Sequence, residues 1–170
     1  MIPKFLSITL WVCFFTLWAG PLAHAQDGEL SAHGREAKIA LGLIDEINAF
    51  RQQRGLHPFT TSEALTRAAL VQSQDMIRYD FFDHISPAPG RTRPQDRALA
   101  SGYSSTTIAE NLFMCMGTGD DAIPGQCFQT WAQSSGHLRN MLDTTRTEIG
   151  VGVATSSAGE TYITAVFGRP

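Results

Sequence analysis

The C-terminal part of the chain contains two segments typical of paired β-strands, and these constrain the fold more than any other feature. Residues 149–155 and 161–167 are rich in Val, Ile, Thr and Tyr, which favour strands. The sequence SSAG at residues 156–159 separates them and is typical of a turn, so we expect an antiparallel hairpin. The apolar segment 106–114 predicts a further strand. A sheet of this kind needs helices to bury its apolar residues.

Helical patterns occur before and between these strands. Ile39, Leu43, Ile47 and Phe50 follow one another at spacings of four, four and three residues, which is the period of an amphipathic helix. Thr61 or Ser62 can cap a second helix, while a third and a fourth follow further along the chain. Mixed helices and strands in this order predict an α+β fold. The expected helices cover residues 36–54, 62–80, 93–101 and 126–134.

The N-terminal 25 residues have the pattern of a secretory signal peptide. Lys4 precedes an uncharged apolar run over residues 5–18, and small residues on either side of His24 form a cleavage pattern. The alternative is a retained membrane anchor, but the run is short for a span of about 20 residues. We therefore expect a secreted or periplasmic protein with no membrane span after cleavage. The expected division is a signal peptide over 1–25, a flexible arm over 26–36 and one domain over 37–170.

The amino-acid composition and net charge of the chain argue against a nucleic-acid partner. The 170 residues are 43% hydrophobic and 17% charged, which is ordinary for a globular domain. The formal net charge of −3 gives no electrostatic attraction to nucleic acid, so no nucleic-acid partner is expected. We expect a monomer.

Two cysteines, Cys115 and Cys127, remain after the signal segment is set aside. In an oxidising compartment such a pair predicts a disulfide, which would close the loop between them. Two buried free thiols are the alternative.

Three polar residues, His84, Glu110 and His137, are the candidates for chemistry. Glu110 lies within an apolar strand segment, where a carboxylate is costly unless it is paired. Two histidines and a glutamate could bind a divalent metal such as zinc. Alternatively, the carboxylate could orient an imidazole for general-base catalysis, with Ser86 and Ser135 as the nearest hydroxyls. The third reading is a polar network that only ties loops together.

Seven segments, which cover most of residues 41–170, carry a family resemblance. In chain order they are LIDEINAFRQQRGLHPF, ALTRAALVQSQDM, FFDHISPAPGRTRPQDRALASGY, IAENLF, WAQSSGHLRNML, EIGVGVA and YITAVFGRP. Together they resemble the CAP superfamily of cysteine-rich secretory, antigen-five and pathogenesis-related proteins, and most closely its bacterial SCP-like branch. The resemblance implies a three-layer α/β/α sandwich around a small, mainly antiparallel sheet.

The resemblance also implies a surface cleft lined by two histidines and two glutamates. The first histidine corresponds to His84, the first glutamate to Glu110 and the last histidine to His137. The second glutamate has no counterpart, because Trp131 is followed by Ala, Gln and Ser. Its absence removes a negative charge that would attract a cation. The residues expected to support the cleft are Asn111, Gln133, Ser135 and Asn140.

The functions associated with such proteins are diverse, because a fold does not determine an activity. Members of the superfamily are associated with binding of lipids, divalent metals, glycans and protein partners, and occasionally with proteolysis. We expect the His/Glu cleft to bind a divalent cation, zinc first, or a small ligand. One alternative is a peptidase-like or esterase-like hydrolase that uses His84 or His137. The other is a non-catalytic domain that interacts with a lipid, a glycan or a protein.

Overall fold

The computed structural model describes residues 22–170, with side chains from residue 34 onward. Most of the expected signal peptide, residues 1–21, lies outside the described residues. Within the described part, helices and strands alternate along the chain as an α+β fold requires. The elements are α1 (Leu22–Gln52), β1 (Thr60–Thr61), α2 (Glu63–Tyr79), α3 (Pro94–Ala100), β2 (Ala109–Met116), the 3-10 turn η1 (Asp120–Ala122), α4 (Ile123–Gln133), α5 (Ser135–Met141), β3 (Glu148–Thr155) and β4 (Glu160–Gly168).

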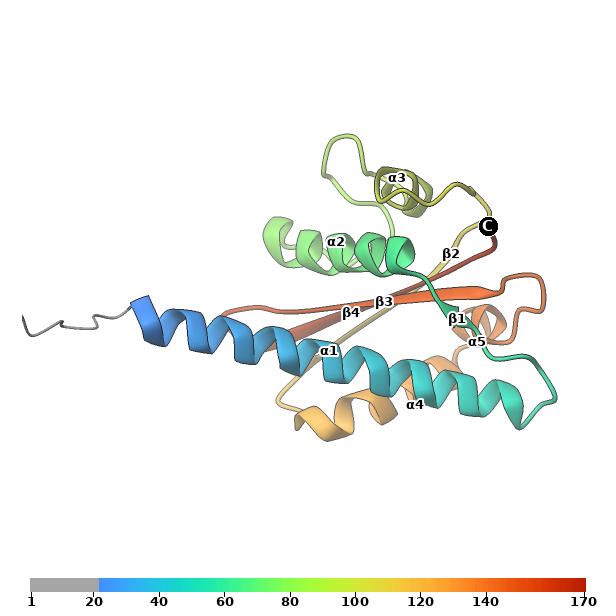
Figure 1. The fold of residues 1–170 in the computed structure, drawn as a ribbon, viewed down its shortest axis with the longest axis horizontal. Helices are drawn as coiled ribbons and strands as arrows, with labels where there is room; N and C mark the ends of the chain where they lie inside the picture. Colours follow the sequence, from blue (N-terminus) through green and yellow to red (C-terminus); the bar gives the residue numbers. More distant parts are fainter. Residues whose placement is uncertain (1–21) are drawn as a thin grey trace, which may run out of the picture.

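The four strands form one sheet in the order β1-β3-β4-β2. β4 pairs antiparallel with both β3 and β2, whereas the two residues of β1 pair parallel with the start of β3. Figure 1 shows α2 and α3 on one side of this sheet and α1 and α4 on the other. The expected three-layer α/β/α sandwich with a mainly antiparallel sheet is therefore confirmed.

Close contact between α2 and β3 depends on two glycines of the predicted hairpin. A Cβ atom added to Gly150 would lie 2.1 Å from the backbone nitrogen of Thr66, and one added to Gly152 would lie 2.1 Å from that of Leu70. Because both neighbours are backbone atoms of α2, no side-chain rotation could relieve such a contact. The helix backbone therefore rests directly on the strand.

The opposite face of the sheet holds the larger apolar core. Side chains of α1 and α4 pack there against β3 and β4, as the spacing of apolar residues in the first helix predicts. Trp131 is fully buried, and its Nε1 donates a hydrogen bond to the carbonyl of Leu112 at 2.9 Å. This bond attaches α4 to the outer edge of β2. Other fully buried members of this core are Ile39, Leu43, Ile47, Met141, Ile149, Ile163 and Phe167.

The structure differs from the sequence-based expectation at three places. Residues 26–36, expected as an irregular arm, belong to α1, which begins at Leu22. Glycines in this stretch weaken a helix by about 1 kcal/mol each but do not end it, and no proline interrupts residues 22–52. The short elements β1 and α5 were not predicted. Within the part of the chain described here, no helix combines the length and apolar character that crossing a bilayer requires.

Candidate functional site

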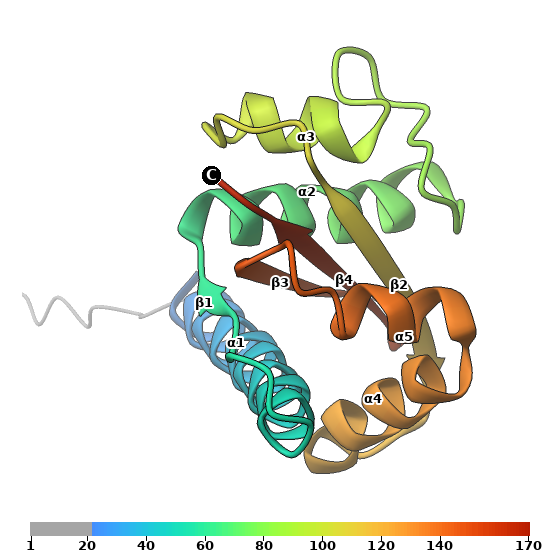
Figure 2. The same cartoon turned by 90° about the vertical axis from the view of Figure 1, so that its right-hand side faces the viewer.

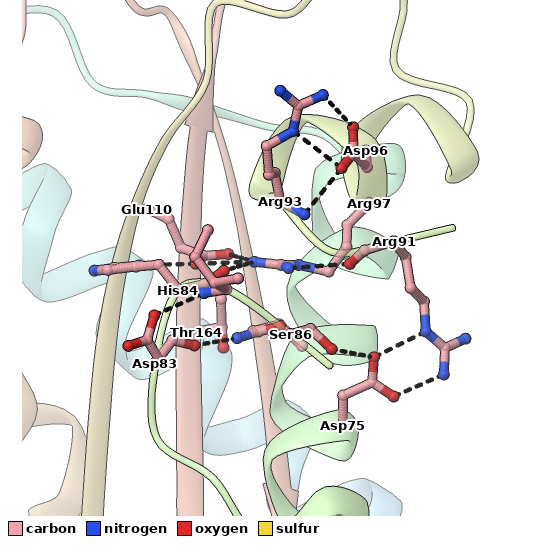
Figure 3. A network of polar contacts seen from close by, with 12 residues as sticks. Asp75, Asp83, His84, Ser86, Arg91, Arg93, Asp96, Arg97, Glu110 and Thr164 are labelled. Atoms are coloured by element: carbon pink, nitrogen blue, oxygen red, sulfur yellow. Dashed lines mark hydrogen bonds and ion pairs between the residues drawn. The ribbon is translucent and has the colours of Figure 1, made fainter. Parts of the chain in front are cut away.

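The carboxylate of Glu110 is the centre of the candidate site. Glu110 lies in β2, and only 1% of its side chain is exposed. The Nη2 atom of Arg97 donates to both carboxylate oxygens, at 3.0 and 2.8 Å. On its other side, Oε1 of Glu110 lies 2.9 Å from Nδ1 of His84 (Figure 3). The partner that a buried acid requires is thus an arginine from α3, which the sequence analysis did not identify.

Arg97 also fixes the loop that carries His84. Its Nη2 donates to the carbonyl of His84 at 3.1 Å, and its Nη1 donates to the carbonyls of Arg91 and Thr92 at 3.2 and 3.0 Å. One guanidinium, whose side chain is fully buried, therefore binds both the loop backbone and the carboxylate that faces the loop.

A second ion pair anchors the same loop to α2. The Nε and Nη2 atoms of Arg91 donate to the two carboxylate oxygens of Asp75, at 2.8 and 2.7 Å (Figure 3). Ser86 donates to Asp75 at 3.3 Å, and Gln72 donates to the carbonyl of Asp83 at 2.6 Å. Bidentate pairs of this kind fix geometry as well as charge. The segment on either side of His84 is therefore held at several points.

One ring nitrogen of His84 is hydrogen-bonded within the described chain and the other is not. Its Nδ1 faces Glu110, and 48% of its side chain is exposed. The hydrogen bond to Glu110 raises the pKa of His84, whereas burial and the charge of Arg97 act in the opposite direction. In the neutral ring with Nδ1–H donating to Glu110, Nε2 carries the lone pair that a ligand can use, and a cation bound there would compete with the proton that Glu110 favours.

His137 approaches the same strand from α5. Asn111, the neighbour of Glu110, donates to the carbonyl of His137 at 3.1 Å. Asn140 donates to Oδ1 of Asn111 at 2.8 Å and to the carbonyl of Glu110 at 3.4 Å. Asn111 and Asn140 therefore join α5 to β2.

The His137 ring is in a less polar setting than that of His84. Its Nδ1 is buried and has no hydrogen-bond partner among the described residues, and its ring centroid lies 6.1 Å from that of Trp131. Burial lowers the pKa of His137, and the charge of His84 lowers it further. The lowered pKa favours the neutral imidazole of His137, which is the form that binds metals.

The other residues proposed for the cleft make no comparable contacts. Gln133 and Ser135 are exposed, and no hydrogen bond joins their side chains to His84, Glu110 or His137. Ser86 is fully buried. Its hydroxyl donates a hydrogen bond to Asp75 and accepts one from the backbone nitrogen of Ala88. Neither of the two serines considered as nucleophiles is thus paired with an imidazole.

The expected three-residue metal site is not assembled. Among residues whose side chains are described, no three His, Cys, Asp or Glu side chains converge closely enough to hold a metal ion. The physical reason is that the Glu110 carboxylate is already engaged by Arg97 and His84. The structure pairs His84, from the loop between α2 and α3, with the Glu110 carboxylate, and Asn111 beside Glu110 binds the backbone of His137 in α5.

The expected disulfide is not formed either. Cys115 in β2 and Cys127 in α4 are both free and buried. They belong to the same apolar core, where a thiol packs as a small hydrophobic side chain. Burial raises the pKa of both, so the reactive thiolate is disfavoured.

Comparison with known sequences identifies proteins that are similar to this chain over most of its length. Residues 44–167 match the family described as CAP, the cysteine-rich secretory protein family. The uncharacterized protein YkwD of Bacillus subtilis is 34% identical over 116 residues, which cover 68% of this chain and 42% of YkwD. The uncharacterized membrane protein YlbC of the same organism is 27% identical over 65% of this chain and 30% of YlbC. The chain thus spans less than half the length of these relatives.

Solved structures show the same fold. An extracellular protein with an SCP domain from Bacillus anthracis superposes with a TM-score of 0.68 at 24% identity, over 79% of this chain and 41% of that one. NaASP2 with Zn2+ superposes with a TM-score of 0.58 at 13% identity, over 78% of this chain and 80% of that one.

Proposed function

Since this chain belongs to the CAP family, whose members share a fold but no single activity, we propose that it is a binding protein in which His84 and His137 take a divalent cation. Zinc is the cation proposed, because imidazole nitrogen is one of its usual ligands and water can fill an open position. The proposal is limited to this domain, because the curated relatives are more than twice its matched length.

The observation that carries the proposal is the hydrogen bond between Nδ1 of His84 and the arginine-held carboxylate of Glu110. Metal-binding histidines usually donate their second ring nitrogen to a carboxylate, which fixes the tautomer and increases the basicity of the ligating nitrogen. A ring that is half exposed, with its other nitrogen free, fits that role. Glu110 would then orient His84 from behind without touching the ion.

The donor set supports a weak site. His84 and His137 would supply two nitrogens, and water would complete the coordination. The second glutamate of the family pattern is missing, and Gln133 near its place adds no charge. When bound, zinc would acidify one of its waters. Nothing in the arrangement of Ser86 or Ser135 favours a hydrolase over a binding protein.

Zinc titration tests this proposal directly. We expect zinc to raise the thermal midpoint of the wild-type protein and to shift the NMR signals of both imidazoles in a saturable way. His84→Ala and His137→Ala should each abolish the shift, because two ligands cannot be reduced to one without loss of the site. Glu110→Gln should weaken binding by about 10- to 100-fold, the usual effect of losing a carboxylate behind a ligating histidine.

A matched control comes from His57, an exposed histidine in the connector after α1. His57→Ala should leave the zinc response unchanged. An equal loss in His57→Ala, or an unchanged response in His84→Ala, would contradict the assignment of the site.

Export is part of the same proposal. The pattern of residues 1–25 and the extracellular nature of the B. anthracis structural neighbour support a secreted or periplasmic location. Expression with residues 1–25 intact in a bacterial host should give a processed protein that begins at Gln26. Intact-mass measurement of the exported fraction checks this, and an unprocessed N-terminus in that fraction would contradict it.

A further inference from the structure

A pocket lined by neither His84 nor His137 contains arginines that the proposed function does not use. It has a volume of about 360 Å³ and lies where the C-terminal end of α1 meets the connector to β1 and the segment between α5 and β3. Its lining includes Arg51 and Arg146 but no Asp or Glu. Leu56 and Pro58 contribute apolar surface, and Thr60 and Thr144 contribute hydroxyl groups.

Arg51 carries a buried positive charge without a direct carboxylate partner. Only 3% of the residue is exposed, yet its side-chain hydrogen bonds within the described chain all go to backbone carbonyls: from Nε to His57 at 2.8 Å, and from Nη1 to Met141 and Asp143 at 2.8 Å each. Its Nη2 makes no hydrogen bond to any residue that the structure describes. Burial lowers the pKa of Arg51, partly offset by the nearby charge of Asp143.

Arg146 brings a second guanidinium to the same pocket. Its Nη1 pairs with the carboxylate of Asp143, the residue whose carbonyl accepts from Arg51. The Asp143 carboxylate also accepts two hydrogen bonds from Thr145, so few of its acceptor positions remain free. The Nε atom of Arg146 is buried and has no partner within the described chain. Arg146 therefore pairs with the Asp143 carboxylate while Arg51 binds only the Asp143 carbonyl, and each guanidinium keeps an N–H group without a hydrogen-bond partner among the described residues.

We propose that this pocket binds a small organic anion, with its phosphate or carboxylate head at Arg51 and Arg146 and its apolar part against Leu56 and Pro58. A buried cation is stabilised by a matching anion, and a guanidinium presents its N–H groups in the geometry that such oxygens accept. The volume is in the range of small-molecule sites, and the threonine hydroxyls add further donors. A bare inorganic ion would leave the apolar lining uncovered.

The structural role of Arg51 does not account for this arrangement. Its three carbonyl contacts already tie the end of α1 to the α5–β3 segment through Nε and Nη1. The Arg51 guanidinium also stacks on the Phe59 ring, 3.6 Å from its centroid, and none of these contacts requires a second arginine in the same pocket. The buried Nε of Arg146 has no partner among the described residues, and such groups are rare and call for a ligand or ordered water.

Phenyl phosphate, inorganic phosphate and benzyl alcohol are suitable probes, and NMR titration of the full domain is the measurement. We expect phenyl phosphate to shift the amide signals of Gly55, Leu56 and Thr144 in a saturable way. Inorganic phosphate should bind about threefold or more weakly, since it lacks the apolar part. Benzyl alcohol, which lacks the charge, should not bind. Equal affinity for the two phosphates, or no saturable shift with phenyl phosphate, would overturn the proposal.

Variants locate the binding. Arg146→Gln should weaken phenyl phosphate binding by about tenfold or more, the effect of losing a charge-assisted hydrogen bond. Leu56→Asp, which places a carboxylate in the lining, should abolish it and serves as an independent variant if Arg146→Gln is poorly folded. Arg67→Gln removes an arginine that pairs with Glu63 on the surface of α2 and should change nothing. Equal weakening by Arg67→Gln, or binding that survives Leu56→Asp, would refute this location. Zinc binding at the cleft is measured separately and does not depend on the result.

Discussion

Replacing Arg97 with methionine is expected to lower the free energy of unfolding by about 3–5 kcal/mol. Methionine keeps an unbranched apolar stem but is shorter than arginine, and it removes the charge that faces Glu110, whose side chain is 1% exposed. A buried carboxylate without its cation is costly, and the three backbone carbonyls that Arg97 binds would also lose their donor. Chemical denaturation monitored by circular dichroism measures the change.

The double variant Arg97→Met/Glu110→Leu separates charge from packing. Because neither charge is then buried, we expect it to be more stable than Arg97→Met alone. Arg93→Met is the matched control, since Arg93 pairs with Asp96 on the exposed surface of α3. It should have a far smaller effect. If the double variant is no more stable than Arg97→Met, the ion pair is not the source of the loss.

The second large effect is expected at Gly152. Gly152→Ala would place a Cβ 2.1 Å from the backbone nitrogen of Leu70, so α2 would have to move away from β3. Overpacking of this kind is expected to cost about 3 kcal/mol, the upper end of its usual range. For a domain of this size that corresponds to a fall of about 6–12 °C in the thermal midpoint.

Gly125→Ala provides the comparison for Gly152→Ala. Gly125 lies within α4, and a Cβ added there meets nothing within 4 Å. Alanine is the better helix former, so this variant should be as stable as the wild type or slightly more stable. A similar loss in both alanine variants would show that the glycine contact between α2 and β3 is not what determines the effect.

Much of the fold could be predicted because periodicity reports which residues are buried. The spacing of Ile39, Leu43 and Ile47 identified the helix that packs on the sheet, and all three are almost fully buried. The paired strands at the C-terminal end were predicted to within a residue. β1 was missed because two residues are too short to show a pattern. α5, with seven residues, was missed for the same reason.

The candidate site could be predicted only in part. Glu110 stood out because an acid within an apolar strand needs a partner, and the pairing with His84 follows the expected pattern. Arg97 could not be identified as that partner, because an arginine in a short helix is usually on the surface. Only the packing of α3 against α2 shows that its side chain is fully buried. The same contact explains why Glu110 is not free to act as a metal ligand.

The position of β4 has a consequence for how the protein is made. β2 and β3 have no contact as strands except through β4, which lies between them in the sheet (Figure 2). During translation the sheet cannot assemble until the ribosome has passed residue 168, whatever helices form earlier. Until β4 has been made, the edges of β2 and β3 that pair with it stay without a partner strand.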